Sequence, residues 1–242
     1  MIELKDVKKA YENREVLKGI TTVFETGKIN LIIGASGSGK SVLMRSMVGL
    51  IDIDSGSINY DGRILDFENY EQTREIRRDI GMLFQGSALF NSASVQDNVE
   101  FPLKMFTNMT KEERLERVNF CLKHVNLENV NKKFPSEISG GMKKRVGIAR
   151  AIALDIKYLF CDEPNSGLDP ITSRVIDNLI KDITEEFKIT TIINTHDMKT
   201  VFDIGDNIVF IYNGSKWWEG TKDEVKNSSS NELQAFLNAS YI

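Results

Sequence analysis

Cysteine is scarce in this chain, and an excess of basic charge is absent. The 242 residues include two cysteines, Cys121 and Cys161, which lie forty residues apart and form no metal-binding or redox motif. We therefore expect a reduced protein, with the cytoplasm as the default compartment. Lysine and arginine number 31 against 35 acidic residues, which gives a formal net charge of −4. Because nucleic-acid-binding proteins usually carry a basic face, we expect no nucleic acid among the partners.

Long apolar runs are also missing. The longest candidates, 29–33 and 207–212, have the length of strands and fall well short of the ~20 residues that a membrane helix needs. The first residues are charged, unlike those of a signal peptide. If the protein works at a membrane, we expect another chain to span it. We find no internal repeat and no long low-complexity segment, and only 227–230 has the composition of a linker.

One motif that is present binds phosphate in other proteins. Residues 34–41 read Gly-Ala-Ser-Gly-Ser-Gly-Lys-Ser and match G-x-x-x-x-G-K-[ST] without a mismatch. The run 28–33 before it is typical of a buried parallel strand, and 42–50 after it is apolar at helical spacing. The alternative is a glycine-rich turn without a ligand. The backbone N–H groups of such a loop and the positive end of the helix favour a bound phosphate. The residues predicted to bind nucleotide here are Gly34, Ser36, Gly37, Ser38, Gly39, Lys40 and Ser41.

Two acidic residues follow a second apolar strand. Asp162 and Glu163 come directly after 157–161, which predicts that they lie at a strand end. An aspartate there can hold Mg²⁺ through water, and a glutamate beside it can orient and deprotonate a water molecule. Ser41 is expected to supply a further oxygen to Mg²⁺, and Lys40 to reach the β- and γ-phosphates. The alternative for the acidic pair is a solvated loop.

A second anion site is predicted elsewhere in the chain. Ser139, Gly140 and Gly141 stand just before a helix that we expect to begin near Lys143, so exposed amides and a hydroxyl gather at a helix N-terminus. Two phosphate sites far apart in one sequence are explained if two copies lie head to tail. The phosphate loop of one copy and residues 139–141 of the other would then close over the same ATP.

The remaining pattern predicts one large α/β domain, and the 41% apolar content is enough for its core. We expect hairpin turns at 61–62 and 213–214, and an amphipathic helix over 111–122 with Leu115, Val118 and Leu122 on one face. The segment 232–238 is either a packed terminal helix or a docking element. The expected layout is a nucleotide-binding core at 1–85 and 156–226, a helical insertion at 86–155 and a tail at 227–242.

Taken in order, these motifs resemble the ATP-binding subunit of ABC transporters over nearly the whole chain. Gln85 matches the Q-loop, 166–169 the D-loop and His196 the switch histidine. The resemblance implies a P-loop NTPase fold with a RecA-like parallel core sheet, an antiparallel β subdomain and an inserted helical subdomain. It also implies ATP and Mg²⁺ as cofactors, a second copy of the chain and transmembrane permease subunits as partners, and a peripheral location at the cytoplasmic face of the inner membrane.

The resemblance assigns a role to individual residues as well. Tyr11 is similar to the adenine-stacking residue, and Asp169 to the contact across the dimer. The implied catalytic residues are Glu163 as the base, His196 as the γ-phosphate sensor, Gln85 and Lys40. The implied metal ligands are Ser41, Gln85 and Asp162.

Two residues depart from the usual family pattern: Met142 stands where glutamine is common, and Asn165 where threonine is common. The stretch 138–146 and the segments 83–85, 88–90, 97–99 and 101–103 resemble phospholipid transporters of the Mla/Mce type, which implies an Mce-type lipid-binding partner. Other transporters, for amino acids or lipoproteins, and a division-complex signalling ATPase remain alternatives. A soluble ABC protein acting on ribosomes or in DNA repair is disfavoured, because the chain has one ATPase unit and no long coiled-coil insertion.

Overall fold

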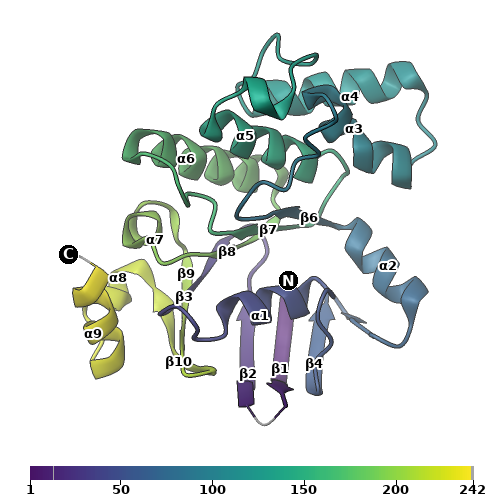
Figure 1. The fold of residues 1–242 in the computed structure, drawn as a ribbon. Coiled ribbons are helices and arrows are strands. Elements are labelled where there is room, and N and C mark those ends of the chain that lie inside the picture. The colour runs from purple at the N-terminus through teal and green to yellow at the C-terminus, as the bar shows by residue number, and fades with distance from the viewer. Residues whose placement is uncertain (13, 241–242) are drawn as a thin grey trace.

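The computed structural model describes residues 1–12 and 14–240, which form two β-sheets with helices packed against them (Figure 1). The smaller sheet is antiparallel, in the order β2-β1-β4-β5, with strands β1 (Ile2–Tyr11), β2 (Arg14–Phe24), β4 (Ser55–Tyr60) and β5 (Arg63–Ile64). The larger sheet has the order β10-β9-β3-β8-β7-β6, with strands β3 (Ile29–Ile33), β6 (Ile80–Leu83), β7 (Tyr158–Asp162), β8 (Thr190–Asn194), β9 (Asn207–Tyr212) and β10 (Ser215–Thr221). Its neighbouring strands run parallel, except that β10 is antiparallel to β9.

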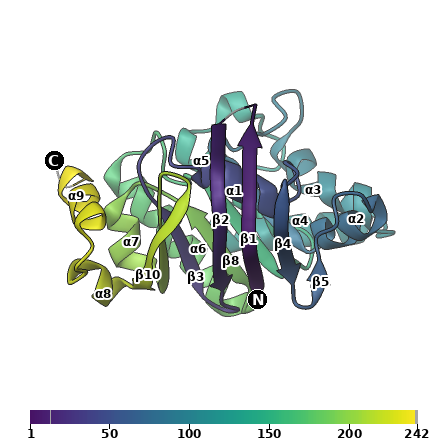
Figure 2. The same ribbon diagram turned by 90° about the horizontal axis from the view of Figure 1, so that it is seen from below.

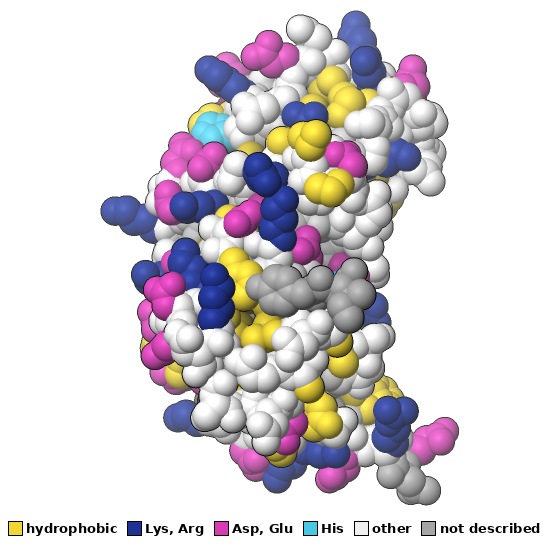
Figure 3. All heavy atoms as spheres, turned by 90° about the vertical axis from the view of Figure 1, so that its left-hand side faces the viewer, with side chains coloured by type: hydrophobic (Ala, Val, Ile, Leu, Met, Phe, Trp, Pro, Cys, Tyr) yellow, Lys and Arg dark blue, Asp and Glu magenta, His cyan; other side chains and the backbone are white. Residues whose placement is uncertain are grey.

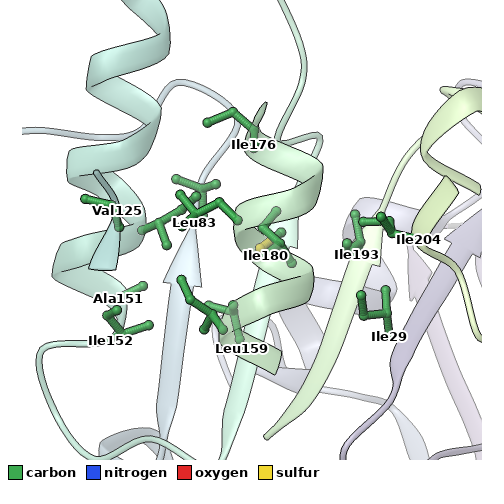
Figure 4. Packing of buried hydrophobic residues seen from close by; sticks show 14 of the residues in the cluster. Ile29, Leu83, Val125, Ala151, Ile152, Leu159, Ile176, Ile180, Ile193 and Ile204 are labelled. Carbon is green, nitrogen blue, oxygen red and sulfur yellow. The ribbon is translucent and has the colours of Figure 1, made fainter. Parts of the chain in front are cut away.

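The larger sheet is buried on both faces. In β3, Leu31 and Ile33 belong to one apolar cluster, whereas Ile32 between them belongs to the other. β7 repeats this alternation, because Leu159 faces the first cluster and Phe160 the second. Continuous apolar strands of this kind are typical of a parallel sheet that is covered on each side. Figure 4 shows part of the first cluster, where apolar side chains of helices and strands meet.

Helices cover one face of the larger sheet, and the smaller sheet together with α1 covers the other. The helices are α1 (Lys40–Met47), α2 (Tyr70–Arg78), α3 (Val95–Phe106), α4 (Lys111–His124), α5 (Gly140–Ala151), α6 (Pro170–Phe187), α7 (Met198–Ile204), α8 (Lys222–Lys226) and α9 (Asn231–Ser240). α3, α4 and α5 fall between β6 and β7 in the chain and form a block at the top of Figure 1. The smaller sheet lies on the opposite side, and Figure 2 shows its strands from below, with α9 and α2 towards opposite edges of the view. The expected α/β fold, with a parallel core sheet, an antiparallel β subdomain and inserted helices, is confirmed.

Local sequence accounts for the sharp turns between strands. Asp61 and Gly62 have φ angles of 49° and 88°, and Asn213 and Gly214 have 49° and 82°. Two successive residues with positive φ make the tight turn that suits the twist of a hairpin, and Asp-Gly and Asn-Gly are favoured there. Both predicted hairpin turns are confirmed.

Two helices differ in detail from what the sequence pattern predicts. In α4, Val118 and Leu122 are buried, but Leu115 is 39% exposed. The buried residues of this helix lie in its C-terminal half, and the N-terminal turns that include Leu115 are not covered. α5 begins at Gly140 rather than near Lys143, since the Ser139 hydroxyl caps it by accepting a hydrogen bond from the Met142 N–H.

The chain's last described helix is packed rather than free. Leu233 and Leu237 of α9 are buried and belong to the first cluster, which favours the packed alternative for this segment. No helix in the described ranges is both long and apolar enough to cross a bilayer. On the face that Figure 3 shows, basic and acidic side chains lie interspersed, so neither sign of charge dominates that face.

Candidate functional site

A cavity of about 1140 Å³ opens above the loop between β3 and α1. Its walls come from the end of the β1–β2 hairpin, from residues 34–42, from the loops after β6, β7 and β8, and from one residue of α9. Because the carboxyl ends of parallel strands meet at the same edge of a sheet, loops far apart in the sequence converge there. The lining residues outside 34–42 are Tyr11, Glu12, Arg14, Val16, Gln85, Glu163, His196 and Phe236.

Glycine is required in the loop between β3 and α1. Gly34 has a φ of 147°, and a Cβ atom there would lie 2.2 Å from the carbonyl oxygen of Ile211. Gly39 has a φ of 108°, and its Cβ would lie 2.9 Å from the Val16 carbonyl oxygen. Gly37 has a φ of 77° and open space around it. These conformations disfavour other residues, and they leave the loop backbone free to face an anion.

Lys40 lies inside this loop. Its ammonium donates hydrogen bonds to the carbonyl oxygens of Gly34, at 2.7 Å, and Ala35, at 2.9 Å. Burial lowers the pKa of Lys40, and the nearby carboxylates of Glu163 and Asp162 oppose that shift. Ser36 also lines the cavity, whereas the Ser38 hydroxyl is buried below the loop without a hydrogen-bond partner.

Three oxygen-bearing side chains meet beside the start of α1. The Asn194 amide donates to Asp162 Oδ1 at 2.7 Å and to Ser41 Oγ at 3.3 Å, which brings the ends of β7 and β8 together with α1. Asn194 Oδ1 is buried and has no hydrogen-bond partner. Hard oxygen donors of this kind suit Mg²⁺, which takes one or two protein ligands and completes its shell with phosphates and water. No cluster of three or more His, Cys, Asp or Glu suited to a metal occurs among the described residues, and Mg²⁺ bound with a nucleotide does not require one.

A second group of polar side chains meets at Glu163. Its Oε2 accepts a hydrogen bond from the Gln85 amide at 2.9 Å, and its Oε1 lies 3.1 Å from Nδ1 of His196. The Gln85 amide also donates to the Ser166 hydroxyl at 3.2 Å. Glu163 has a φ of 46°, which is uncommon outside glycine and turns its side chain off the end of β7. The arrangement can hold a water molecule next to a carboxylate base.

Two predicted residues lie at the margins of this arrangement. Tyr11 lines the cavity and is 46% exposed as a residue, and the Lys9 ammonium lies 5.6 Å from its ring centroid. Asp169 does not line the cavity; it caps α6 by accepting hydrogen bonds from the backbone N–H groups of Ile171 and Thr172, each at 3.0 Å. The hydrogen bond from the Thr172 hydroxyl lowers the pKa of Asp169.

Ser139, Gly140 and Gly141 form the N-terminus of α5 and are not among the residues that line the cavity. Gly141 is packed closely, because a Cβ there would lie 2.5 Å from Cγ2 of Thr172. Gly140 is open, with the nearest atom to its Cβ position 3.8 Å away. The two predicted phosphate sites therefore do not share one cavity within a single chain.

A second cavity, of about 400 Å³, lies between the helical block and the core. Phe90, Phe101 and Phe106 contribute aromatic rings to it, and the Phe90 and Phe101 rings lie 4.9 Å apart. Phe90 and Phe101 are 45% and 42% exposed. Exposed aromatic side chains gathered beside an apolar hollow mark an interaction surface more often than isolated ones do.

Comparison with known proteins gives relatives across the chain. The profile of the ABC transporter family matches residues 17–166. The methionine import ATP-binding protein MetN of Clostridium tetani is 43% identical over 212 residues, which cover 87% of this chain and 66% of that protein. The probable ribonucleotide transport ATP-binding protein mkl of Mycobacterium leprae is 36% identical over 241 residues, 100% of this chain and 70% of that protein. This chain thus spans about two thirds of the length of these relatives.

Solved structures with the same fold include a dimeric ATP-binding cassette in a post-hydrolysis state bound to ADP and phosphate. That structure has a TM-score of 0.84 and 32% identity, and the match covers 92% of this chain and 99% of that one. The structure of cbiO1 from Clostridium perfringens, part of an ABC transporter complex, has a TM-score of 0.86 and 31% identity over 98% of this chain and 94% of that one.

Proposed function

Because this chain belongs to the ABC transporter family, we propose that two copies of it close over two ATP molecules and drive a separate membrane permease. The chain itself is an ABC-type ATPase. The observation that carries the dimer proposal is the separation of the two phosphate sites. The loop around Lys40 opens into the cavity, whereas Ser139 to Gly141 stand outside it and need a second copy to meet a nucleotide.

ATP binds with its phosphates on residues 34–41 and its adenine beside Tyr11. The loop amides, the N-terminal end of α1 and the Lys40 ammonium all favour negative charge at this place. A tyrosine residue that is nearly half exposed offers a flat apolar face for stacking a base. From a second copy, Ser139, Gly140 and Gly141 present the N-terminus of α5 to the γ-phosphate, and Asp169 lies near the contact between copies.

Hydrolysis depends on the group around Glu163. Its carboxylate accepts the proton of the attacking water, Gln85 positions that water, and His196 holds the carboxylate and senses the γ-phosphate. Ser41, Gln85 and Asp162 are the residues that would hold Mg²⁺. When bound, Mg²⁺ supplies positive charge that neutralises the phosphate oxygens.

The permease docks, in this proposal, at the second cavity, where Phe90 and Phe101 are exposed. Gln85 lies on the same connection between β6 and α3 as Phe90, so a movement at the nucleotide reaches this surface through a short stretch of chain. The helical insertion at 86–155 is the subdomain that moves, whereas the tail at 227–242 stays with the core, against which Leu233 and Leu237 pack. Through the permease the protein is held at the cytoplasmic face of the inner membrane.

Phospholipid is the cargo that we propose, together with an Mce-type lipid-binding partner. The support is the sequence of 138–146, with Met142 in place of glutamine, and the segments 83–85, 88–90, 97–99 and 101–103. Methionine and ribonucleotide, which appear in the names of the relatives, are the competing cargoes.

The test is purification of the tagged chain from its own membranes in mild detergent, followed by mass spectrometry of proteins and lipids. A permease, an Mce-type protein and bound phospholipid together would support the proposal. A permease with a different accessory protein would contradict the lipid cargo. The absence of any membrane protein, in a preparation that still hydrolyses ATP, would contradict the permease and favour a soluble or signalling role.

A further inference from the structure

Lys144 carries a buried positive charge that the reaction scheme above does not use. The residue is 4% exposed, and its ammonium donates to the backbone carbonyl oxygens of Gln85 and, at 3.3 Å, of Glu163. Burial lowers the pKa of Lys144, while Cys161, Glu163 and Asp162 nearby oppose that shift. Because a buried ammonium is costly unless its hydrogen bonds are well made, its place here calls for an explanation.

The two carbonyl groups belong to the pair of residues whose side chains meet in the cavity. The Gln85 amide donates to the Glu163 carboxylate at 2.9 Å, and Lys144 holds the main chain of both residues from below. Gln85 follows β6 and Glu163 follows β7, so this ammonium joins the main chains of the two loops in addition to the hydrogen bond between their side chains. Lys144 therefore fixes the main-chain positions from which the Gln85 and Glu163 side chains extend.

Lys144 also belongs to the helix that carries the second phosphate site. Ser139 caps α5, and Lys144 lies five residues further on, about 7.5 Å along the axis at 1.5 Å per residue. The two positions are joined by a rigid, hydrogen-bonded helix. Any displacement of the α5 N-terminus is thus transmitted to the Lys144 ammonium over a short distance.

A second residue of α5 also binds the loop that follows β6. The Arg150 guanidinium donates to the carbonyl oxygens of Ser87 at 2.7 Å and Ala88 at 2.8 Å. Ser87 and Ala88 have φ angles of 62° and 46°, so this loop is held in an uncommon backbone conformation. Between Lys144 and Arg150 on the helix, Gly147 packs so closely that a Cβ atom there would lie 2.7 Å from the Leu83 side chain. Helix α5 and the loop that follows β6 therefore move as one unit.

We propose that Lys144 is a positioning residue that ties Gln85 and Glu163 to the helix whose N-terminus meets the ATP of the second copy. Contact of α5 with the nucleotide of one site then sets the base and the water-positioning amide of the other site. This inference rests on the proposed dimer and adds to it a named link between the two sites.

The experiment compares Lys144→Met, which keeps the length of the side chain but removes its donors, with Lys144→Arg and with wild type. Lys181→Met on the exposed side of α6 is the matched control, because Lys181 touches neither site. For each variant, kcat and KM for ATP are measured, and ATP-driven dimerisation is measured with Glu163→Gln added. A role confined to stability would lower the melting temperature but would not separate kcat from KM and from dimerisation.

For Lys144→Met we expect kcat to fall at least about tenfold, with KM within about twofold and dimerisation retained, since misplacing reacting groups by an ångström is enough for such a loss. Lys144→Arg should recover much of the rate. A kcat for Lys144→Met within twofold of wild type would overturn the inference. If Lys144→Met does not fold, Lys144→Leu, which also lacks a donor, takes its place with the same criteria.

The controls separate this inference from the proposed function. Failure of Glu163→Gln, with and without Lys181→Met, to dimerise with ATP would refute the proposed dimer. Normal dimerisation and hydrolysis in every variant, Lys144→Met included, would refute only the link through Lys144.

Discussion

Asp177 offers a prediction about stability that depends on a single buried carboxyl. It lies on α6, is 3% exposed and accepts hydrogen bonds from the Asn165 amide at 2.8 Å and the Thr200 hydroxyl at 3.0 Å. Burial raises the pKa of Asp177 to about 6, the two hydrogen bonds oppose that shift, and Asp197 and Asp203 add to it. Asp177→Asn keeps the shape of the side chain and removes its charge.

The magnitude follows from the pKa. One pKa unit corresponds to about 1.4 kcal/mol, so raising the pKa from 3.8 to about 6 means that ionised Asp177 lowers the free energy of unfolding by up to about 3 kcal/mol. Because the folded pKa is the higher one, the stability that protonation provides is present in full below pH 3.8. It is lost as the pH rises through about 6.

Asp177→Asn should therefore be more stable than wild type at pH 8, by about 1–3 kcal/mol; this difference in the free energy of unfolding should fall to about a third of that value at pH 4.5 and approach zero below pH 3.8. The amide oxygen still accepts from Asn165, and the amide N–H donates to the Thr200 hydroxyl. Urea or thermal unfolding at both pH values measures the difference, which for a chain of this size is about 2–4 °C in Tm per kcal/mol. Asp182→Asn on the exposed side of α6 is the control and should change little at either pH. The reasoning would be refuted if Asp177→Asn were less stable than wild type at pH 8. It would also be refuted if the difference in the free energy of unfolding between the two proteins did not depend on pH.

Three further predictions concern the nucleotide site. Glu163→Gln should lower the ATPase rate at least about a hundredfold while ATP still binds, and a near-wild-type rate would show that Glu163 is not the base. Lys40→Ala should weaken ATP binding in calorimetry at least about tenfold, because a charge-assisted contact to phosphate is lost; unchanged affinity would contradict its assignment. Tyr11→Ala should raise the Kd for ATP about tenfold through the loss of stacking, and Tyr11→Phe should stay near wild type. Equal effects of the two Tyr11 variants would argue against stacking.

The sequence predicts the strands well where the local signal is strong. β7, from Tyr158 to Asp162, is a short apolar run that ends in an acid, and the structure forms it as the pattern indicates. The phosphate loop is equally recognisable from its glycines and Lys40, although the close approach of the Ile211 and Val16 carbonyl oxygens to Gly34 and Gly39 is seen only in the fold. Leu115 shows the limit: periodicity identifies one face of α4 but cannot tell where the neighbouring helices stop covering it.

The part of the site that sequence reasoning missed is made of contacts between distant segments. Asn194 joins Ser41 to Asp162, and a polar residue at the end of the apolar strand β8 was the available signal. Lys144 looks like one more charge on an amphipathic helix until the fold places it under Gln85 and Glu163. Phe236 of α9 reaches the cavity wall only because the tail folds back beside residue 35.

The most direct test of the account mixes two inactive variants. Lys40→Ala damages the phosphate loop and leaves Ser139 to Gly141 intact. Gly140→Asp does the reverse, because its negative charge repels phosphate, while the space beside Gly140 accepts a side chain and an acid in the first turn suits the helix. Each variant alone should be nearly inactive, since every site in its dimer has one damaged half.

In a mixed dimer, the intact loop of one copy faces the intact α5 N-terminus of the other. We expect ATP hydrolysis to return on mixing, in proportion to the fraction of mixed dimers and to one working site in each. If the mixture stays as inactive as its components although mixed dimers form, each chain completes its own site, and the shared nucleotide site at the centre of this account is wrong.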